Sequence, residues 1–134
     1  GALVVCDILI SNLKNPKSEF LNFVRKLTNS KDIYFNEKVV TSEKKHGFVN
    51  AAHVNLMKAF KNIKNDIDVV LDLYYHMCSI EMTCEELSRS FLIFANDGIS
   101  PYNQERIISL SVSKRINATM QLCGLYDEAG QFAF

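Results

Sequence analysis

Apolar residues recur at intervals of three or four along most of this chain, and polar capping residues interrupt the pattern. An interval of three or four is the repeat of one helix face, whereas a half-buried strand alternates at every second residue. The first segment shows the helical repeat in Leu3, Val4, Ile8, Leu9 and Leu13. The 134 residues therefore predict six or seven helices with little strand, which together form one mainly α, single helical domain spanning residues 1–134.

Predicted helix starts carry Asn, Asp, Ser or Thr, whose side chains accept hydrogen bonds from the free amides of a first turn. In chain order these starts are Asn15-Pro16, Asn36, Asn50, Asn65-Asp66, Thr83 and Ser109. We expect Asn50 to open one helix, and we expect the helix that Thr83 caps to continue to Asn96. These signals predict where the helices begin, and they say nothing about activity.

The two ends of the chain differ from its middle. Residues 123–134 indicate a helix end, a turn at Gly124 and the first half of an apolar strand that closes on Phe132-Ala133-Phe134. That strand has no partner within the sequence, and the chain opens at Gly1 without an initiator methionine or a leader. We therefore expect an internal fragment of a larger protein, part of whose site lies outside these residues.

Charge and composition argue against several classes of protein. Fifteen basic and fifteen acidic residues cancel and form no basic stripe, so we expect no nucleic-acid partner. No apolar run reaches the roughly 18 residues that cross a bilayer, so we expect no membrane association. The cysteines lie in apolar segments without a C-x-x-C pair, which predicts buried, reduced thiols and a cytoplasmic location. They are Cys6, Cys78, Cys84 and Cys123.

The residues that could carry chemistry form no self-contained catalytic set. Ser111 and Lys114 match S-x-x-K literally, but they lie in the first turn of a helix that Ser109 caps. Glu43 and Asn50 flank a predicted turn, where a carboxylate and an amide could hold the ammonium and carboxylate of a small zwitterion. Taken alone, a solvated glutamate and a helix cap explain the same residues. The histidines (His46, His53 and His76) form no close-spaced ligand set with the cysteines, so we expect no metal.

Three longer segments, taken in order, are more specific. They are Ser42-Glu43-x-x-His46-Gly47-x-x-Asn50, Cys78-Ser79-Ile80-Glu81-Met82-Thr83-Cys84-Glu85, and Gly124-Leu125-Tyr126-Asp127-x-Ala129-Gly130-Gln131-Phe132-Ala133. With the opening Gly1-Ala2-Leu3-Val4-Val5, they make the whole chain resemble the serine-dependent glutaminase family. The resemblance implies a serine β-lactamase/transpeptidase-like fold, in which a helical lobe packs on an α/β lobe. This chain is expected to be the helical lobe, with the start of a sheet strand at its C-terminus.

The same resemblance implies an activity. Members hydrolyse L-glutamine to L-glutamate and ammonia through a serine acyl-enzyme, and they use no cofactor. Their S-x-x-K nucleophile would lie before Gly1, so this fragment alone is expected to be inactive. Members usually form homodimers or tetramers, which predicts a homo-oligomer.

The resemblance carries over to four residues. Glu43 is expected to bind the α-ammonium of glutamine, Asn50 to bind substrate and Tyr74 to line the pocket. Tyr126 is expected to be catalytic as well as substrate-binding, as a proton relay or hydrogen-bond donor near the nucleophile. Val49 departs from the arginine that is common in the family at this position.

Two other interpretations of the function stay open. One is a non-catalytic helical module for interaction or assembly, derived from a glutaminase. The other is a β-lactamase or peptidase of the same fold, against which the zwitterion-binding pattern of Glu43 and Asn50 argues.

Overall fold

The computed structural model describes residues 1–124 and 126–133. The chain divides into two compact units, and each is described by itself. Unit 1 contains residues 1–26 and 30–83, and unit 2 contains residues 27–29 and 84–134. The described residues are mainly helical, which confirms the predicted fold class. The prediction of one domain over the whole chain stays a prediction.

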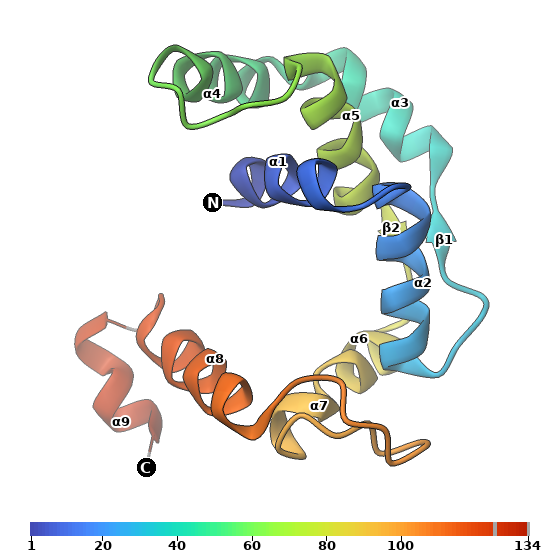
Figure 1. Ribbon diagram of the computed structural model, residues 1–134, viewed down its shortest axis with the longest axis vertical. Helices are drawn as coiled ribbons and strands as arrows, with labels where there is room; N and C mark the ends of the chain where they lie inside the picture. The colour runs from blue at the N-terminus through green and yellow to red at the C-terminus, as the bar shows by residue number, and fades with distance from the viewer. Residues whose placement is uncertain (125, 134) are drawn as a thin grey trace. The chain divides into compact units, whose positions relative to one another are not determined.

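Unit 1 contains five helices and a two-stranded antiparallel sheet among its described residues (Figure 1). The helices are α1 (Ala2–Asn12), α2 (Pro16–Thr28, whose last two residues belong to unit 2), α3 (Glu37–His46), α4 (Phe48–Ala59) and α5 (Ile67–Cys78). The strands β1 (Tyr34–Phe35) and β2 (Ile80–Glu81) pair Tyr34 with Glu81 and Phe35 with Ile80. Strands of two residues are too short to show a strand period in the sequence.

Helix α5 is the centre of unit 1, because α1, α3 and α4 all pack against it. The buried core joins side chains from these four helices and from the α4–α5 loop. It comprises Leu3, Cys6, Val40, Val54, Ile63, Val70, Leu71, Leu73 and Tyr75. Burial of this apolar set is the main stabilising term of the unit, at about 25 cal/mol for each Å² removed from water. The functional side chains described below project from the same helices.

Two predicted caps are confirmed in unit 1. The Asn36 side chain accepts hydrogen bonds from the amides of Lys38 and Val39, at 3.1 and 3.3 Å, and so begins α3. The Asp66 carboxylate does the same for Asp68 and Val69 at the start of α5, at 2.9 and 3.3 Å. Both contacts are local in sequence, which is why the sequence predicted them.

The predicted start of α4 is wrong. Helix α4 begins at Phe48, with Gly47 as its N-cap, and Asn50 is its third residue rather than its cap. Gly47 lies against the buried ring of Tyr75: a Cβ at Gly47 would be 2.1 Å from the Tyr75 hydroxyl oxygen. This close approach lets α4 begin directly after α3, so the Asn50 side chain has no capping role.

Unit 2 consists of short helices and one longer one: α6 (Cys84–Ser90), α7 (Leu92–Ala95), α8 (Leu110–Leu122), the 3₁₀ turn η1 (Tyr126–Glu128) and α9 (Ala129–Ala133). The single helix predicted to reach Asn96 is instead divided at Phe91 into α6 and α7. The Phe91 amide bonds the Ser88 carbonyl at 3.1 Å, a three-residue spacing that tightens the chain between the two helices. Ser109 caps α8 as predicted, its hydroxyl oxygen accepting from the Val112 amide at 3.3 Å.

The predicted C-terminal strand is also wrong for the residues that the structure describes. Residues 129–133 form α9, and Phe134 lies outside the described part. Within that part, β1 and β2 pair only with each other. An unpaired strand leaves its backbone groups unsatisfied, whereas a helix satisfies them within the segment.

The cysteines differ in part from expectation. All four are free thiols, but only Cys6 is buried, whereas Cys78, Cys84 and Cys123 are exposed. Cys78 and Cys84 lie at the end of α5 and the start of α6, where an apolar sequence pattern does not imply burial. No helix in the described part is long and apolar enough to cross a membrane.

Candidate functional site

A pocket of about 270 Å³ lies in unit 1 where the start of α1 meets α4 and α5. Two of the predicted substrate-binding residues, Asn50 of α4 and Tyr74 of α5, line it together. Gly1, Ala2, Leu3, His53 and Met57 form the rest of its wall. The structure therefore brings together two side chains that are 24 positions apart in the sequence.

Glu43, the third predicted substrate-binding residue of unit 1, does not line this pocket, and its relation to Tyr74 is electrostatic. The partly buried Glu43 lies on α3. A hydrogen bond with Cys78, partial burial and the nearby charge of Glu43 raise the pKa of Tyr74. Burial and the charge of Glu43 also raise the pKa of Tyr75. Tyr74 is thus a protonated phenol at neutral pH, and its hydroxyl is a hydrogen-bond donor.

The junction between α3 and α4 holds Glu43 and Asn50 at fixed positions. The buried Tyr75 side chain donates a hydrogen bond from its hydroxyl to the Gly47 carbonyl at 3.3 Å. Because Gly47 has no side chain, the ring can approach the backbone between Glu43 and Asn50. The contact ties the junction to α5, the helix that carries Tyr74.

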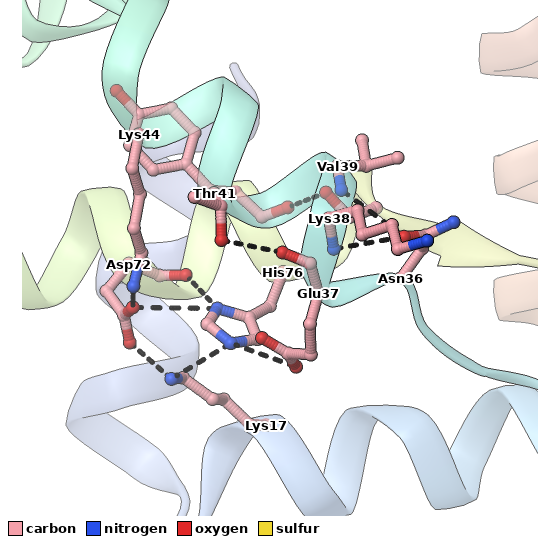
Figure 2. Close-up of polar contacts among 11 residues, drawn as sticks. Lys17, Asn36, Glu37, Lys38, Val39, Thr41, Lys44, Asp72 and His76 are labelled. Atoms are coloured by element: carbon pink, nitrogen blue, oxygen red, sulfur yellow. Dashed lines mark hydrogen bonds and ion pairs between the residues drawn. The ribbon is translucent and has the colours of Figure 1, made fainter.

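A cluster of charged residues, shown in Figure 2, joins α2, α3 and α5. Asp72 of α5 forms ion pairs with Lys17 of α2 and Lys44 of α3, one on each carboxylate oxygen. The buried His76 donates from Nδ1 to the Asp72 carbonyl at 2.6 Å, since a carbonyl can only accept. Its Nε2 lies 3.4 Å from the Lys17 ammonium and 3.9 Å from Glu37.

Asp72 is ionised within this cluster. Burial by itself would raise the pKa of Asp72, but hydrogen bonds from Lys17 and Lys44 and the neighbouring positive charge outweigh it and lower the pKa. Asp72 precedes Tyr74 by two residues, and Lys44 directly follows Glu43. The ion pair thus connects the two backbone segments that carry the candidate site.

A larger hollow of about 550 Å³ also borders α3, α4 and α5. Its lining includes Lys44, Phe48, Asp68, Asp72 and Tyr75, but none of the predicted substrate-binding residues. The charges of Lys44 and Asp72 are directed at each other across its edge. The smaller pocket, which contains Asn50 and Tyr74, is therefore the candidate site.

Tyr126 lies in unit 2, so the geometry of unit 1 does not include it. It begins η1 with a φ of 42°, in the left-handed region that favours glycine, and its side chain is 79% exposed. Backbone strain of this kind is frequent at functional sites. The roles of Glu43, Asn50, Tyr74 and Tyr126 stay predictions.

Sequence reasoning missed several residues near the pocket. It considered His53 only as a metal ligand, although His53 follows Asn50 by three residues and therefore shares its helix face. It gave no role to Lys44 or Asp72. The described residues contain no group of three or more His, Cys, Asp or Glu placed to hold a metal ion. Ser111 and Lys114 are both exposed in the first half of α8, in unit 2.

Solved structures share this arrangement of helices. A Bacillus subtilis glutaminase, in its covalent complex with 5-oxo-L-norleucine, superposes with a TM-score of 0.83 at 29% identity, over 98% of this chain and 46% of that protein. A Bacillus glutaminase gives a TM-score of 0.83 at 26% identity, over 98% of this chain and 44% of that protein. The chain is accordingly the helical part of a protein with the β-lactamase-like fold.

Sequence comparison identifies the family within that class. The family model described as glutaminase matches residues 1–134. The glutaminase of Christiangramia forsetii is 50% identical over 134 residues, and that of Saccharophagus degradans is 49% identical. Both alignments cover all of this chain and 44% of the relative, so the chain spans less than half the length of these proteins. The chain belongs to the glutaminase family, as its motifs predicted.

Proposed function

We propose that the polypeptide carrying this chain is a glutaminase that hydrolyses L-glutamine to L-glutamate and ammonia. In this reaction the side-chain amide bond breaks, and water supplies the hydroxyl of the new carboxyl group. A serine of an S-x-x-K motif outside the 134 residues forms the acyl-enzyme and is then released by water. The observation that carries the proposal is the pocket lined jointly by Asn50 and Tyr74, beside the charge of Glu43.

The proposed roles follow from the charges of the substrate. Free glutamine is a zwitterion, so its recognition needs an anion for the α-ammonium and hydrogen-bond donors for the α-carboxylate. Glu43 supplies the anion, while the Asn50 amide and the Tyr74 hydroxyl supply donors. Tyr126 donates a hydrogen bond or relays a proton at the reacting amide.

One structural neighbour supports the same substrate class. The Bacillus subtilis glutaminase formed its covalent complex by reaction with 6-diazo-5-oxo-L-norleucine. This compound is an analogue of glutamine that carries a reactive diazoketone in place of the amide. It therefore provides a chemical probe for the complete polypeptide that carries the present chain.

The test is glutamate release from L-glutamine by the complete polypeptide, with L-asparagine as the control substrate. We expect glutamate from glutamine, little aspartate from asparagine, and one covalent adduct of 6-diazo-5-oxo-L-norleucine by mass spectrometry. A folded polypeptide that neither turns over glutamine nor forms the adduct would refute the proposal. That result would favour the alternative of a non-catalytic helical module.

Location and assembly form a second part of the proposal. We propose a cytoplasmic homo-oligomer, a dimer or tetramer, because the chain belongs to the glutaminase family and unit 1 exposes large apolar side chains. Phe48 and Phe60 of unit 1 are 76% and 71% exposed, and packing against another copy would remove their apolar surface from water. Light scattering of the complete polypeptide tests the assembly, and a monomer at micromolar concentration would contradict it. Cell fractionation tests the location.

A further inference from the structure

The charged cluster shares α3 and α5 with the candidate site, but none of its residues lines the candidate pocket. Lys44 and Glu43 are consecutive residues of α3, and Asp72 and Tyr74 are two residues apart on α5. The ion pair between Lys44 and Asp72 therefore joins α3 to α5 within one or two residues of both functional side chains. Any sliding of α3 along α5 would have to break this contact.

Asp72 restrains two helices at the same time. One of its carboxylate oxygens binds Lys17 of α2 and the other binds Lys44 of α3 (Figure 2). The carbonyl of the same residue accepts the hydrogen bond from His76. Through its two carboxylate oxygens the Asp72 side chain thus ties α2 and α3 to α5.

The exposure of the cluster indicates what it contributes. The side chains of Asp72, Lys17 and Lys44 are 32%, 40% and 48% exposed. Ion pairs this accessible to water contribute little to folding stability, because water solvates the separated charges almost as well. The contacts can nevertheless fix the relative position of two helices, since a displacement of only about 1 Å lowers the efficiency of a site strongly.

We propose that Asp72 is a positioning residue: by pairing with Lys44 it sets the register of α3 on α5 and so places Glu43 against Tyr74 for binding the substrate. This inference rests on the proposed glutaminase function, and it assigns to Asp72 an effect on substrate binding rather than on the chemical step. The Asp72 carboxylate makes no contact with the substrate in this account. It acts only through the position of Glu43.

The direct test is Asp72→Asn in the complete polypeptide. The amide has one acceptor oxygen, and its NH₂ group faces a lysine ammonium that cannot accept a hydrogen bond, so one restraint is lost. We expect the KM for L-glutamine to rise about tenfold and kcat to change less than about threefold. Lys44→Met removes only the α3 restraint and is expected to give the same pattern, which provides a second variant if Asp72→Asn does not fold.

A matched control separates position from charge. Asp68→Asn removes the same charge one turn earlier on α5, at an exposed residue for which no ion pair is formed in the described part of the chain. It is expected to leave KM unchanged. A general loss of charge on α5 would instead raise KM in both variants, which would overturn the proposal.

A double-mutant cycle then tests whether Asp72 changes KM through Glu43. If Asp72 acts through Glu43, Asp72→Asn should raise KM about tenfold in the wild type and by less than about twofold in Glu43→Gln. Equal effects in both backgrounds would overturn the proposal, as would an unchanged KM in Asp72→Asn and Lys44→Met. A wild type that releases no glutamate would instead refute the proposed function itself, and this role of Asp72 with it.

Discussion

Replacing Asp7 with asparagine tests how α1, which forms one wall of the candidate pocket, is held in place. The Asp7 side chain is only 4% exposed, and its carboxylate accepts hydrogen bonds from the α4–α5 loop. The Lys64 amide lies 3.1 Å from both oxygens, and the Asn65 amide and side-chain NH₂ each lie 2.8 Å from Oδ1. A single carboxylate thus satisfies three donors.

Asparagine has nearly the same shape, but it replaces one acceptor oxygen with a donor. That new NH₂ donor faces the Lys64 amide and finds no acceptor there, the Lys64 amide keeps only its contact with Oδ1, and the remaining bonds lose the assistance of the charge. A charge-assisted hydrogen bond contributes about 1.5–3 kcal/mol, and an unsatisfied buried donor costs about 1–3 kcal/mol. Because these terms overlap, we expect Asp7→Asn to lower the free energy of unfolding by about 3 kcal/mol at pH 7.

The loss should depend on pH. Burial by itself would raise the pKa of Asp7, but hydrogen bonds from Asn65 and Lys64 and the charge of Lys58 outweigh it and lower the pKa. A carboxylate with a lowered pKa stabilises the fold above its unfolded-state pKa of about 3.9, and this stabilisation disappears as the pH falls through the folded-state pKa. Asparagine does not titrate, so the difference between wild type and variant should be full at pH 7 and shrink below about pH 4.

Urea unfolding of the complete polypeptide at pH 7 and at about pH 3.5 measures both effects. Asp32→Asn, at an exposed aspartate of the same unit, is the control and should change stability by less than about 0.5 kcal/mol. Hydrogen exchange at the Lys64 and Asn65 amides gives a local readout, which should quicken in Asp7→Asn. A variant as stable as the control at pH 7, or a difference that does not vary with pH, would refute the reasoning.

Three further predictions concern the site and its support. Glu43→Gln should raise the KM for glutamine about 10- to 100-fold with little change in kcat, because a charge-assisted contact to the α-ammonium is lost. Steady-state kinetics measure both constants, and an unchanged KM would show that Glu43 does not bind the substrate. Tyr126→Phe should lower kcat about 100-fold at similar KM, and a normal kcat would show that the hydroxyl takes no part in the reaction. Gly47→Ala should destabilise the protein by about 1–3 kcal/mol in urea unfolding. The new Cβ would lie 2.1 Å from the Tyr75 hydroxyl oxygen and 2.7 Å from the Glu43 carbonyl oxygen. A variant as stable as the wild type would show that the α3–α4 junction can relax.

The sequence predicted what local interactions decide. The caps Asn36, Asp66 and Ser109 bond to amides two or three residues away, and their pattern marked three helix starts correctly. The same reasoning failed at Asn50, where the packing of Gly47 on Tyr75 replaces a local cap. It failed at the C-terminus because an apolar run is compatible with either a strand or a helix.

The candidate site was predicted only in part. Family motifs predicted Glu43, Asn50 and Tyr74, and the structure places Asn50 and Tyr74 in one pocket, whose lining does not include Glu43. No periodicity or spacing pointed to Asp7 or Asp72 as supports of this pocket. Both are single acidic residues within helical patterns, and the sequence does not show which donors they meet.

By itself the sequence determined the helical class of this chain, most of its helix starts and its family. These depend on residues within one or two turns of each other, or on motifs that are continuous in the chain. Only the tertiary structure decided that Asp7 meets Asn65, 58 positions away, and that Asp72 holds lysines from two other helices. The physical reason is that such contacts join segments that are far apart in the sequence, so their geometry depends on how the helices of unit 1 pack around their shared core.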